Sequence, residues 1–150
     1  MIRITVNNIY KDFKFKSKKI QNLCKEILIN YEYNIIKLNF IFSDDSELNS
    51  LKIKYFDEDV LTDVITFPIK NDKDLESEIY ISVDRAIFNS KENNVTLNSE
   101  IIRLIIHALL HLLGYDDKRK IDKDHMFKKQ EELVDKFSNI NLLWMKKIKN

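Results

Sequence analysis

The spacing of hydrophobic side chains along this chain predicts where its first helices and strands lie. Ile2, Ile4 and Val6 alternate with polar neighbours, which predicts a half-buried strand. The run IIKLNFIF at 35–42 alternates in the same way and predicts a central strand. Between the two strands, apolar residues recur every three or four positions, which predicts an amphipathic helix. These residues are Ile20, Leu23, Cys24, Ile27, Leu28 and Tyr31.

Polar breaks divide the middle of the chain into shorter elements. Asp44 precedes Glu47 by three residues, the spacing of a capping box at the start of a helix. The β-branched run TDVITF then predicts a strand that stops at Pro68, the only proline. NDKDLESE, which follows, predicts a polar loop before the short strand IYISVD. A further helix is expected to begin near Asp84.

The second half of the chain is predicted to be helical. A hydrophobic helix is expected from Ser99 or Glu100 to about Leu113, and a charged amphipathic helix follows it. The second helix carries Met126, Phe127, Leu133, Val134 and Phe137. Strands in the first half and helices in the second predict one α+β domain over residues 1–150, in which helices cover a mixed sheet.

Charge and composition narrow the class of protein. The net charge is +1, but residues 1–30 and 101–150 are basic whereas residues 31–100 are acidic. The basic ends suit a polyanionic partner, although solvated lysines are the commoner explanation for such runs. The N-terminus lacks the apolar core of a signal peptide, and the longest apolar stretch, Ile101 to Leu113, is too short to span a bilayer. We therefore expect a cytoplasmic protein with no membrane partner.

Two histidines lie four residues apart in the hydrophobic helix IIRLIIHALLHLL. This spacing places His107 and His111 on the same face, so both imidazoles can bind one metal ion. An arbitrary pair of this kind is more often satisfied within a core. In so apolar a segment, however, two imidazoles need polar partners, which favours a shared metal.

The only glycine of the chain follows this helix. Gly114 lies where a helix C-cap belongs, and it accepts the backbone conformation that reverses the chain. The turn is expected to bring Asp117 to the histidines as a third ligand, leaving a fourth zinc position for water, as in catalytic sites. Asp116 is the adjacent alternative, with a turn role expected for one of the two aspartates. His125 is a further, less favoured ligand.

Two other metalloenzyme classes share parts of this pattern. Zinc peptidases with two helical histidines have a glutamate directly after the first one, where this chain has Ala108, which disfavours peptidase chemistry. Two histidines and one carboxylate also occur in non-heme iron oxygenases. The helical presentation of the ligands gives that class little support.

The segment HALLHLLGYDD at 107–117 resembles the signature HGxLHLxGYDH of the YbeY family, bacterial endoribonucleases of ribosomal RNA maturation. LKIKYFDEDVLTDVITFP at 51–68 and ESEIYIS at 76–82 resemble two further blocks of that family. The resemblance implies a zinc-dependent hydrolase that cleaves single-stranded RNA in 16S rRNA 3′-end maturation and ribosome quality control. It implies one zinc ion on His107, His111 and Asp117, and the ribosome or its small subunit as partner. The expected catalytic group is a metal-bound water; neither a general base nor the oligomeric state follows from the sequence.

Two departures from the family pattern bear on activity. Asp117 stands where the family has a third histidine, and Phe56 stands where it has an arginine linked to catalysis. Arg103, one turn before His107, is a candidate substrate-binding replacement, with an ion pair to Glu100 as the alternative role. RNA phosphates would otherwise meet lysines, which include Lys14, Lys16, Lys18 and Lys19. Phe56 also keeps open a second function, a non-enzymatic zinc-containing ribosome-assembly or RNA-binding factor.

Overall fold

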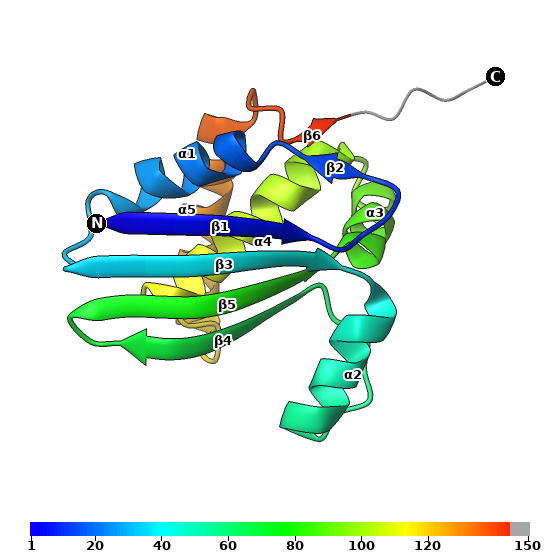
Figure 1. Ribbon diagram of the computed structural model, residues 1–150, viewed down its shortest axis with the longest axis horizontal. Coiled ribbons are helices and arrows are strands. Elements are labelled where there is room, and N and C mark those ends of the chain that lie inside the picture. Colours follow the sequence, from blue (N-terminus) through cyan, green and yellow to red (C-terminus); the bar gives the residue numbers. More distant parts are fainter. Residues whose placement is uncertain (145–150) are drawn as a thin grey trace.

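A computed structural model describes residues 1–144 of the chain. Four strands form one sheet in the order β1-β3-β5-β4 (Figure 1). Their bounds are β1 (Ile2–Asn8), β3 (Ile35–Ser43), β4 (Val64–Asn71) and β5 (Asp74–Ser82). β1, β3 and β5 run parallel, whereas β4 pairs with β5 in the antiparallel direction, so the sheet is mixed, as predicted.

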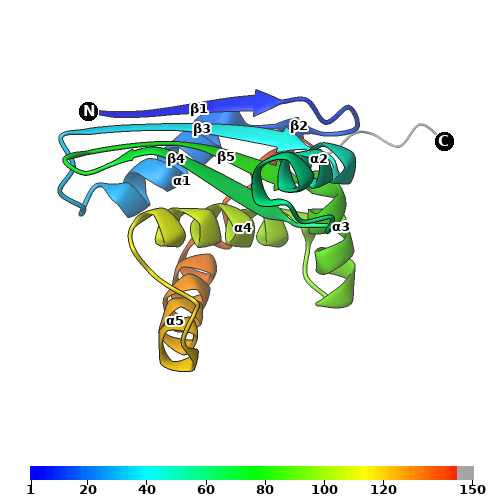
Figure 2. The same cartoon turned by 90° about the horizontal axis from the view of Figure 1, so that it is seen from below.

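Helices cover one face of this sheet (Figure 2). On that side lie α1 (Ser17–Leu28), α4 (Leu97–Leu112) and α5 (Lys120–Phe137), while α2 (Asp45–Phe56) and α3 (Val83–Glu92) lie toward one end. A two-residue pairing of β2 (Lys14–Phe15) with β6 (Leu143–Trp144) joins the two ends of the described chain. The structure thus confirms the predicted α+β class.

Alternating side chains of the central strands build the core against α1 and α4. From β3 these are Ile36, Leu38, Phe40 and Phe42, all buried. α1 contributes Cys24, whose side chain is fully buried, as the helical spacing predicted. Ten of the sixteen residues of α4 are buried, which makes it the central helix of the fold. Burial of this apolar surface is the main source of folding free energy.

The polar loop predicted for NDKDLESE is wrong. β4 continues through Pro68 to Asn71, and β5 begins at Asp74 after a turn of two residues. Pro68 is tolerated because β4 is an edge strand, and a register shift follows it before Lys70. The acidic residues alternate with Leu75 and Ser77, which are buried in the core. The polar residues of this segment therefore belong to a strand with one partly solvent-exposed face.

Capping residues mark the starts of α3 and α4, and only α4 begins earlier than predicted. α3 begins at Val83, near Asp84 as expected, with the Ser82 hydroxyl accepting from a backbone N–H. α4 begins at Leu97, where the Thr96 hydroxyl accepts from Ser99 N at 3.1 Å. No single helix of the described residues is long and apolar enough to cross a membrane; α3 and α4 together meet those criteria as a pair bent by 115°.

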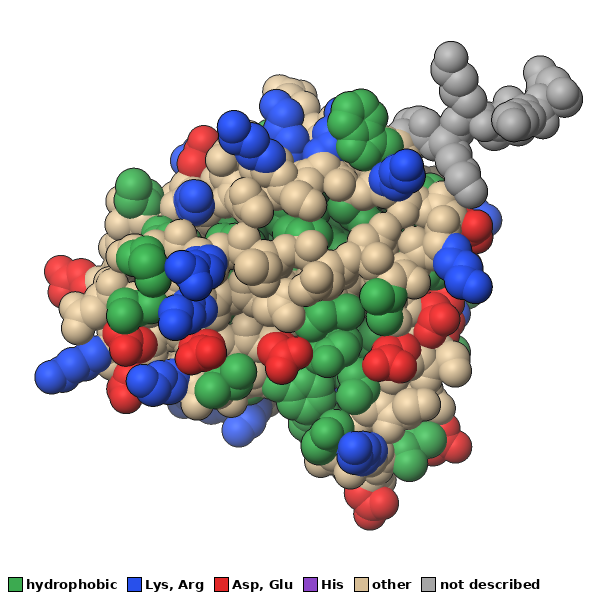
Figure 3. Space-filling view, viewed as in Figure 1, with side chains coloured by type: hydrophobic (Ala, Val, Ile, Leu, Met, Phe, Trp, Pro, Cys, Tyr) green, Lys and Arg blue, Asp and Glu red, His purple; other side chains and the backbone are tan. Residues whose placement is uncertain are grey.

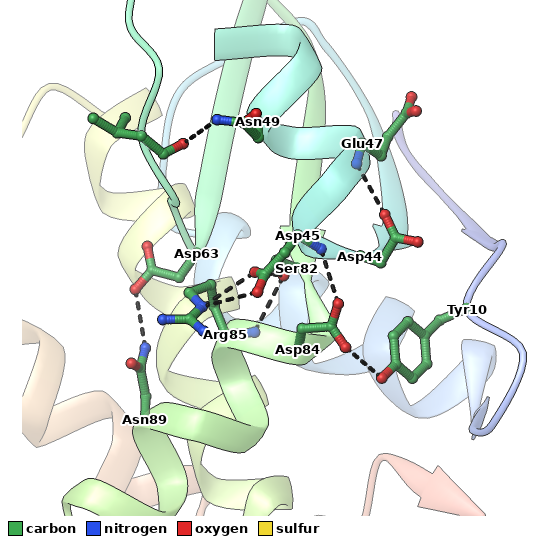
Figure 4. A network of polar contacts seen from close by, with 11 residues as sticks. Tyr10, Asp44, Asp45, Glu47, Asn49, Asp63, Ser82, Asp84, Arg85 and Asn89 are labelled. Carbon is green, nitrogen blue, oxygen red and sulfur yellow. Dashed lines mark hydrogen bonds and ion pairs between the residues drawn. The ribbon is translucent and has the colours of Figure 1, made fainter.

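A polar network fixes the start of α2 against α3 (Figure 4). The Asp45 carboxylate accepts from Arg85 Nε at 3.1 Å and from Ser82 Oγ at 2.8 Å. Asp84 accepts from Asp45 N at 3.0 Å and from the Tyr10 hydroxyl at 2.6 Å. Burial, reinforced by this bond to Asp84, raises the pKa of Tyr10 above its usual range. The opposite end of α2 is thereby held in a defined place beside β4.

Candidate metal site

His107 and His111 lie one turn apart near the end of α4. Their ring centroids are 4.7 Å apart, with an angle of 83° between the ring planes. Both residues are partly buried and partly exposed to solvent. α4 therefore presents both imidazoles on one face, as the four-residue spacing predicted.

A Schellman turn at Gly114 ends α4. Gly114 N donates to His111 O at 3.1 Å, and Tyr115 N donates to Leu110 O at 3.0 Å. Gly114 has φ of 100°, a conformation that side chains other than hydrogen rarely adopt. The predicted role of the single glycine is confirmed, and the turn directs the following residues back toward the histidines.

Asp117 is the residue that this turn brings to the pair. Its Oδ2 lies 3.6 Å from His111 Nε2, and the ligand atoms of Asp117, His107 and His111 all lie within 4.8 Å of one another. Ligand atoms around a tetrahedral zinc ion, each bonded at roughly 2.1 Å, lie about 3.4 Å apart. The three side chains could therefore hold one metal ion after small rotations, and they offer two nitrogens and one oxygen.

The protonation of the imidazoles suits metal binding. Burial, and then the neighbouring His107, lower the pKa of His111 below its ordinary 6.5, despite the opposing effect of Asp117. His111 is consequently neutral near pH 7, with a lone pair for a ligand bond. His107 Nδ1 lies 2.7 Å from Gln130 Oε1, a distance at which Nδ1–H donates and Nε2 is left to bind a metal.

Gln130 contacts the candidate site, although no sequence motif indicated it. It is buried on α5, on the same helical face as Met126 and Val134, and its Nε2 contacts Glu131 Oε2 at 3.3 Å. In the sequence, the indication was a polar residue, Gln130, at a position of the amphipathic helix where an apolar one is expected. Such a residue is retained in a core when it has a specific partner, here His107.

The alternative ligands have other surroundings. Asp116 Oδ1 accepts from Lys118 N at 2.9 Å, the turn role expected for one of the two aspartates. The His125 ring lies beside Tyr115, with centroids 5.9 Å apart. Neither Asp116 nor His125 belongs to the group of close ligand atoms found among residues 1–144.

Arg103 is held by two carboxylates. Its guanidinium donates to Glu100 Oε2 at 3.0 Å, the alternative contact expected from the sequence, and to Glu131 at 2.9 and 3.1 Å. These contacts join α4 to α5 and, through Glu131, reach Gln130. As a substrate contact, Arg103 stays a prediction.

A hollow of about 480 Å³ opens beside the imidazoles. Its walls include His107 and His111 from α4, Lys52 and Phe56 from α2, and most of the first half of β4. Asp63, just before β4, also lines the hollow, and its Oδ2 accepts from Asn89 Nδ2 at 3.2 Å (Figure 4). The candidate metal site is thus open to a ligand of moderate size.

Comparison with known proteins identifies the family. The family model described as "Endoribonuclease YbeY" matches residues 5–138. The chain belongs to the YbeY family. This membership confirms the resemblance of the metal-site motif and the endoribonuclease class that it implied.

Individual relatives cover most of the chain. The Endoribonuclease YbeY of Karelsulcia muelleri (strain GWSS) is 41% identical over 125 residues, which span 83% of this chain and 84% of the relative. The protein of that name from Amoebophilus asiaticus (strain 5a2) is 37% identical over 130 residues, or 82% and 88% of the two chains. The solution structure of TM1509 from Thermotoga maritima matches with a TM-score of 0.60 and 29% identity, covering 90% of this chain and 87% of that one.

Proposed function

We propose that this YbeY-family chain is a zinc-dependent endoribonuclease specific for single-stranded RNA, acting in 16S rRNA 3′-end maturation and ribosome quality control. The observation that carries the proposal is the convergence of His107, His111 and Asp117 within 4.8 Å in a family of endoribonucleases. A single domain spanning 1–150 would carry the activity. Its action in the cytoplasm, on the ribosome or its small subunit, is part of the same proposal.

The donor set suits zinc. Two imidazole nitrogens and one carboxylate oxygen are ordinary zinc ligands, and three protein ligands leave one position open, as in catalytic sites. A zinc ion bound there would polarise a phosphoryl oxygen and lower the pKa of a coordinated water, the chemistry that phosphodiester hydrolysis requires.

Three features of the chain place the candidate ligands close to a geometry that suits metal binding. Gln130 orients His107 through the 2.7 Å contact at Nδ1, and burial keeps His111 neutral. The Gly114 turn delivers Asp117 from outside the helix. Each of these features reduces the rearrangement needed when a metal binds, which strengthens binding.

Lysines near the start of α1 would extend the RNA path. Lys14, Lys18 and Lys19 are exposed there. Lys16 N donates to Leu142 O at 2.7 Å, and Leu142 N donates to Asn98 Oδ1 at 2.7 Å, so this segment adjoins the first turn of α4. Asn98 and His107 are roughly 14 Å apart along the helix axis, so these lysines would attract RNA phosphates at a distance from the histidines.

A second candidate function is that of a non-enzymatic, zinc-containing factor for ribosome assembly or RNA binding. The observation favouring it is Phe56, an uncharged side chain in the hollow beside the histidines.

Incubation of a defined single-stranded RNA with the metal-loaded protein separates the two functions. The endoribonuclease predicts internal cleavage that stops on chelation and is abolished in a His111→Ala variant. RNA binding without cleavage by the metal-loaded wild-type protein would support the binding factor instead. Cleavage that persists in His111→Ala would point to a contaminating nuclease and remove the support for the proposal.

A further inference from the structure

Lys52 lines the hollow beside the histidines. Among its described lining residues, Lys52 is the only lysine or arginine. Asp63 lines the same space, and the neighbouring Asp117 adds a second carboxylate to the site. Asp63 would repel an RNA phosphate entering this space, whereas Lys52 would attract it.

Contacts with neighbouring residues of α2 and the turn after it position the Lys52 side chain. Lys52 and Phe56 lie four residues apart on α2, and the Lys52 ammonium lies 4.5 Å from the centroid of the Phe56 ring. The Lys52 carbonyl accepts from Glu58 N at 3.2 Å, after Asp57 has turned the chain with φ of 56°. The Lys52 side chain is 21% exposed, so most of it is packed while part of it remains in contact with solvent.

Phe56 is itself fixed by an aromatic cluster at the edge of the sheet. Its ring lies 5.9 Å from that of Phe67 on β4. Phe67 in turn contacts Tyr55 at 5.3 Å and Tyr80 of β5 at 5.7 Å. Figure 3 shows hydrophobic side chains gathered over this part of β4 and α2. The uncharged Phe56 thus serves as a platform for the ammonium of Lys52.

The present partner of Lys52 is replaceable. Lys52 Nζ lies 3.7 Å from Glu58 Oε2, and the Glu58 side chain is 56% exposed. Ion pairs at such exposed positions are weak, so a phosphate can displace this carboxylate. The other nearby cation, Arg103, is bound by both Glu100 and Glu131. Of these two cations, Lys52 therefore has fewer ion pairs to give up.

We propose that Lys52 binds an RNA phosphate in the hollow beside His107 and His111, supplying from position 52 the positive charge that Phe56 lacks. The inference rests on the proposed function, because it takes RNA as the ligand. Lys52 would touch the substrate and so contribute to binding and to neutralising charge during cleavage.

The test compares Lys52→Met with Lys54→Met. Methionine keeps most of the apolar stem and removes the charge. Lys54 is a matched control on α2: its ammonium lies 5.1 Å from the Tyr55 ring, and it is not among the described residues lining the hollow. Metal-loaded proteins are titrated against one labelled single-stranded RNA. If the RNA is cleaved, single-turnover rates give the half-saturation concentration; if it stays intact, fluorescence anisotropy gives Kd.

Lys52→Met should weaken RNA binding roughly tenfold, the usual effect of losing one charge-assisted contact. It should also reduce the slope of log affinity against log salt by about 0.7, the value for one phosphate on a single strand. Lys54→Met should stay within about twofold of wild type, since exposed lysines away from the site contribute little. Lys52→Arg should retain binding, and Glu58→Gln should tighten it by releasing the ammonium.

Equal affinities and salt slopes for Lys52→Met and Lys54→Met would overturn the role of Lys52, whether or not the RNA is cleaved. Absence of cleavage by wild type, with the affinity difference intact, would instead count against the proposed endoribonuclease and leave Lys52 as an RNA-binding residue. Circular dichroism checks that each variant is folded. Should Lys52→Met fail to fold, unchanged binding in the Glu58→Gln variant would overturn the proposal.

Discussion

Asp116 and Asp117 are adjacent in sequence but have different surroundings. Asp116 caps a local turn through Lys118 N, whereas Asp117 approaches the imidazoles of α4. A carboxylate that only stabilises an exposed turn can be removed without changing a metal site a few ångströms away. The two neighbours therefore provide a controlled comparison at the scale of single residues.

We predict that purified wild-type protein holds about one zinc ion per chain, the stoichiometry of a single three-ligand site. Asp117→Ala should lose that ion, while Asp116→Ala and His125→Ala should retain it, since neither residue lies in the ligand group of residues 1–144. Elemental analysis after dialysis measures the content. Loss of zinc only in His125→Ala would show that the ligand assignment is wrong.

We expect Gln130 to influence metal binding through its contact with His107. Gln130→Met preserves the buried volume but removes the acceptor 2.7 Å from His107 Nδ1. We expect zinc affinity to fall by roughly 10- to 100-fold, the usual effect of losing a hydrogen bond to a ligand histidine. Competition with a chromophoric chelator measures it. Lys128→Met on the exposed face of the same helix is the control, and an unchanged affinity in Gln130→Met would contradict this role.

At the scale of elements, α4 and its terminal turn act together. The helix holds His107 and His111 on one face, and the Schellman turn sets the direction in which the chain returns toward them with Asp117. Both features were predictable, because they depend on local spacing and on the one glycine of the sequence. The histidine spacing and the glycine C-cap each involve residues within one or two helical turns, so a short stretch of sequence is enough to predict them.

Gly114→Ala should destabilise the protein by about 1 to 2 kcal/mol, the cost of left-handed backbone for a residue with a side chain. A Cβ atom at this position meets no other atom within 4 Å, so strain in the backbone accounts for the whole loss. Denaturant titration measures the free energy of unfolding. Gly114→Asn should lose less, because asparagine tolerates positive φ, and equal stability of the alanine variant would refute the argument.

Other elements could not be predicted from local patterns. β5 looks polar between Asp74 and Glu78 because one face of the sheet is uncovered, and its identity as a strand depends on pairing with both β3 and β4. The two-residue strands β2 and β6 exist only because they pair across almost the whole chain. Likewise, Gln130 and Lys52 join the site through the packing of α5 and α2, which no local spacing reveals.

At the scale of the whole molecule, the ion pairs of Arg103 tie α4 to α5 and make stability depend on pH. The hydrogen bond from Arg103 lowers the pKa of Glu131 below its ordinary 4.5. A carboxyl whose pKa is lower in the folded state stabilises the fold above its ordinary pKa. That contribution is lost as the pH falls through the folded-state pKa.

We therefore expect the free energy of unfolding of wild type to fall more steeply below about pH 4.5 than that of Glu131→Gln. The difference should be about 1 kcal/mol or less, because Glu131 is partly exposed. Urea titrations over a series of acidic pH values measure both curves. Burial raises the pKa of Glu100 and gives a contribution of opposite sign, but Glu100 is present in both proteins. Parallel curves would show that the Arg103–Glu131 pair does not stabilise the fold.

Cys24 is buried in the core, so its thiol cannot react with reagents while the protein is folded. Its side chain has no exposed surface, and burial raises the pKa of its thiol above the usual range, so the reactive thiolate is scarce while the protein is folded. Thiol-alkylating reagents will consequently modify Cys24 at the rate at which the core opens. The thiol of Cys24 therefore reports opening of the core, and a metal ion bound by His107, His111 and Asp117 would slow its modification by stabilising the folded state.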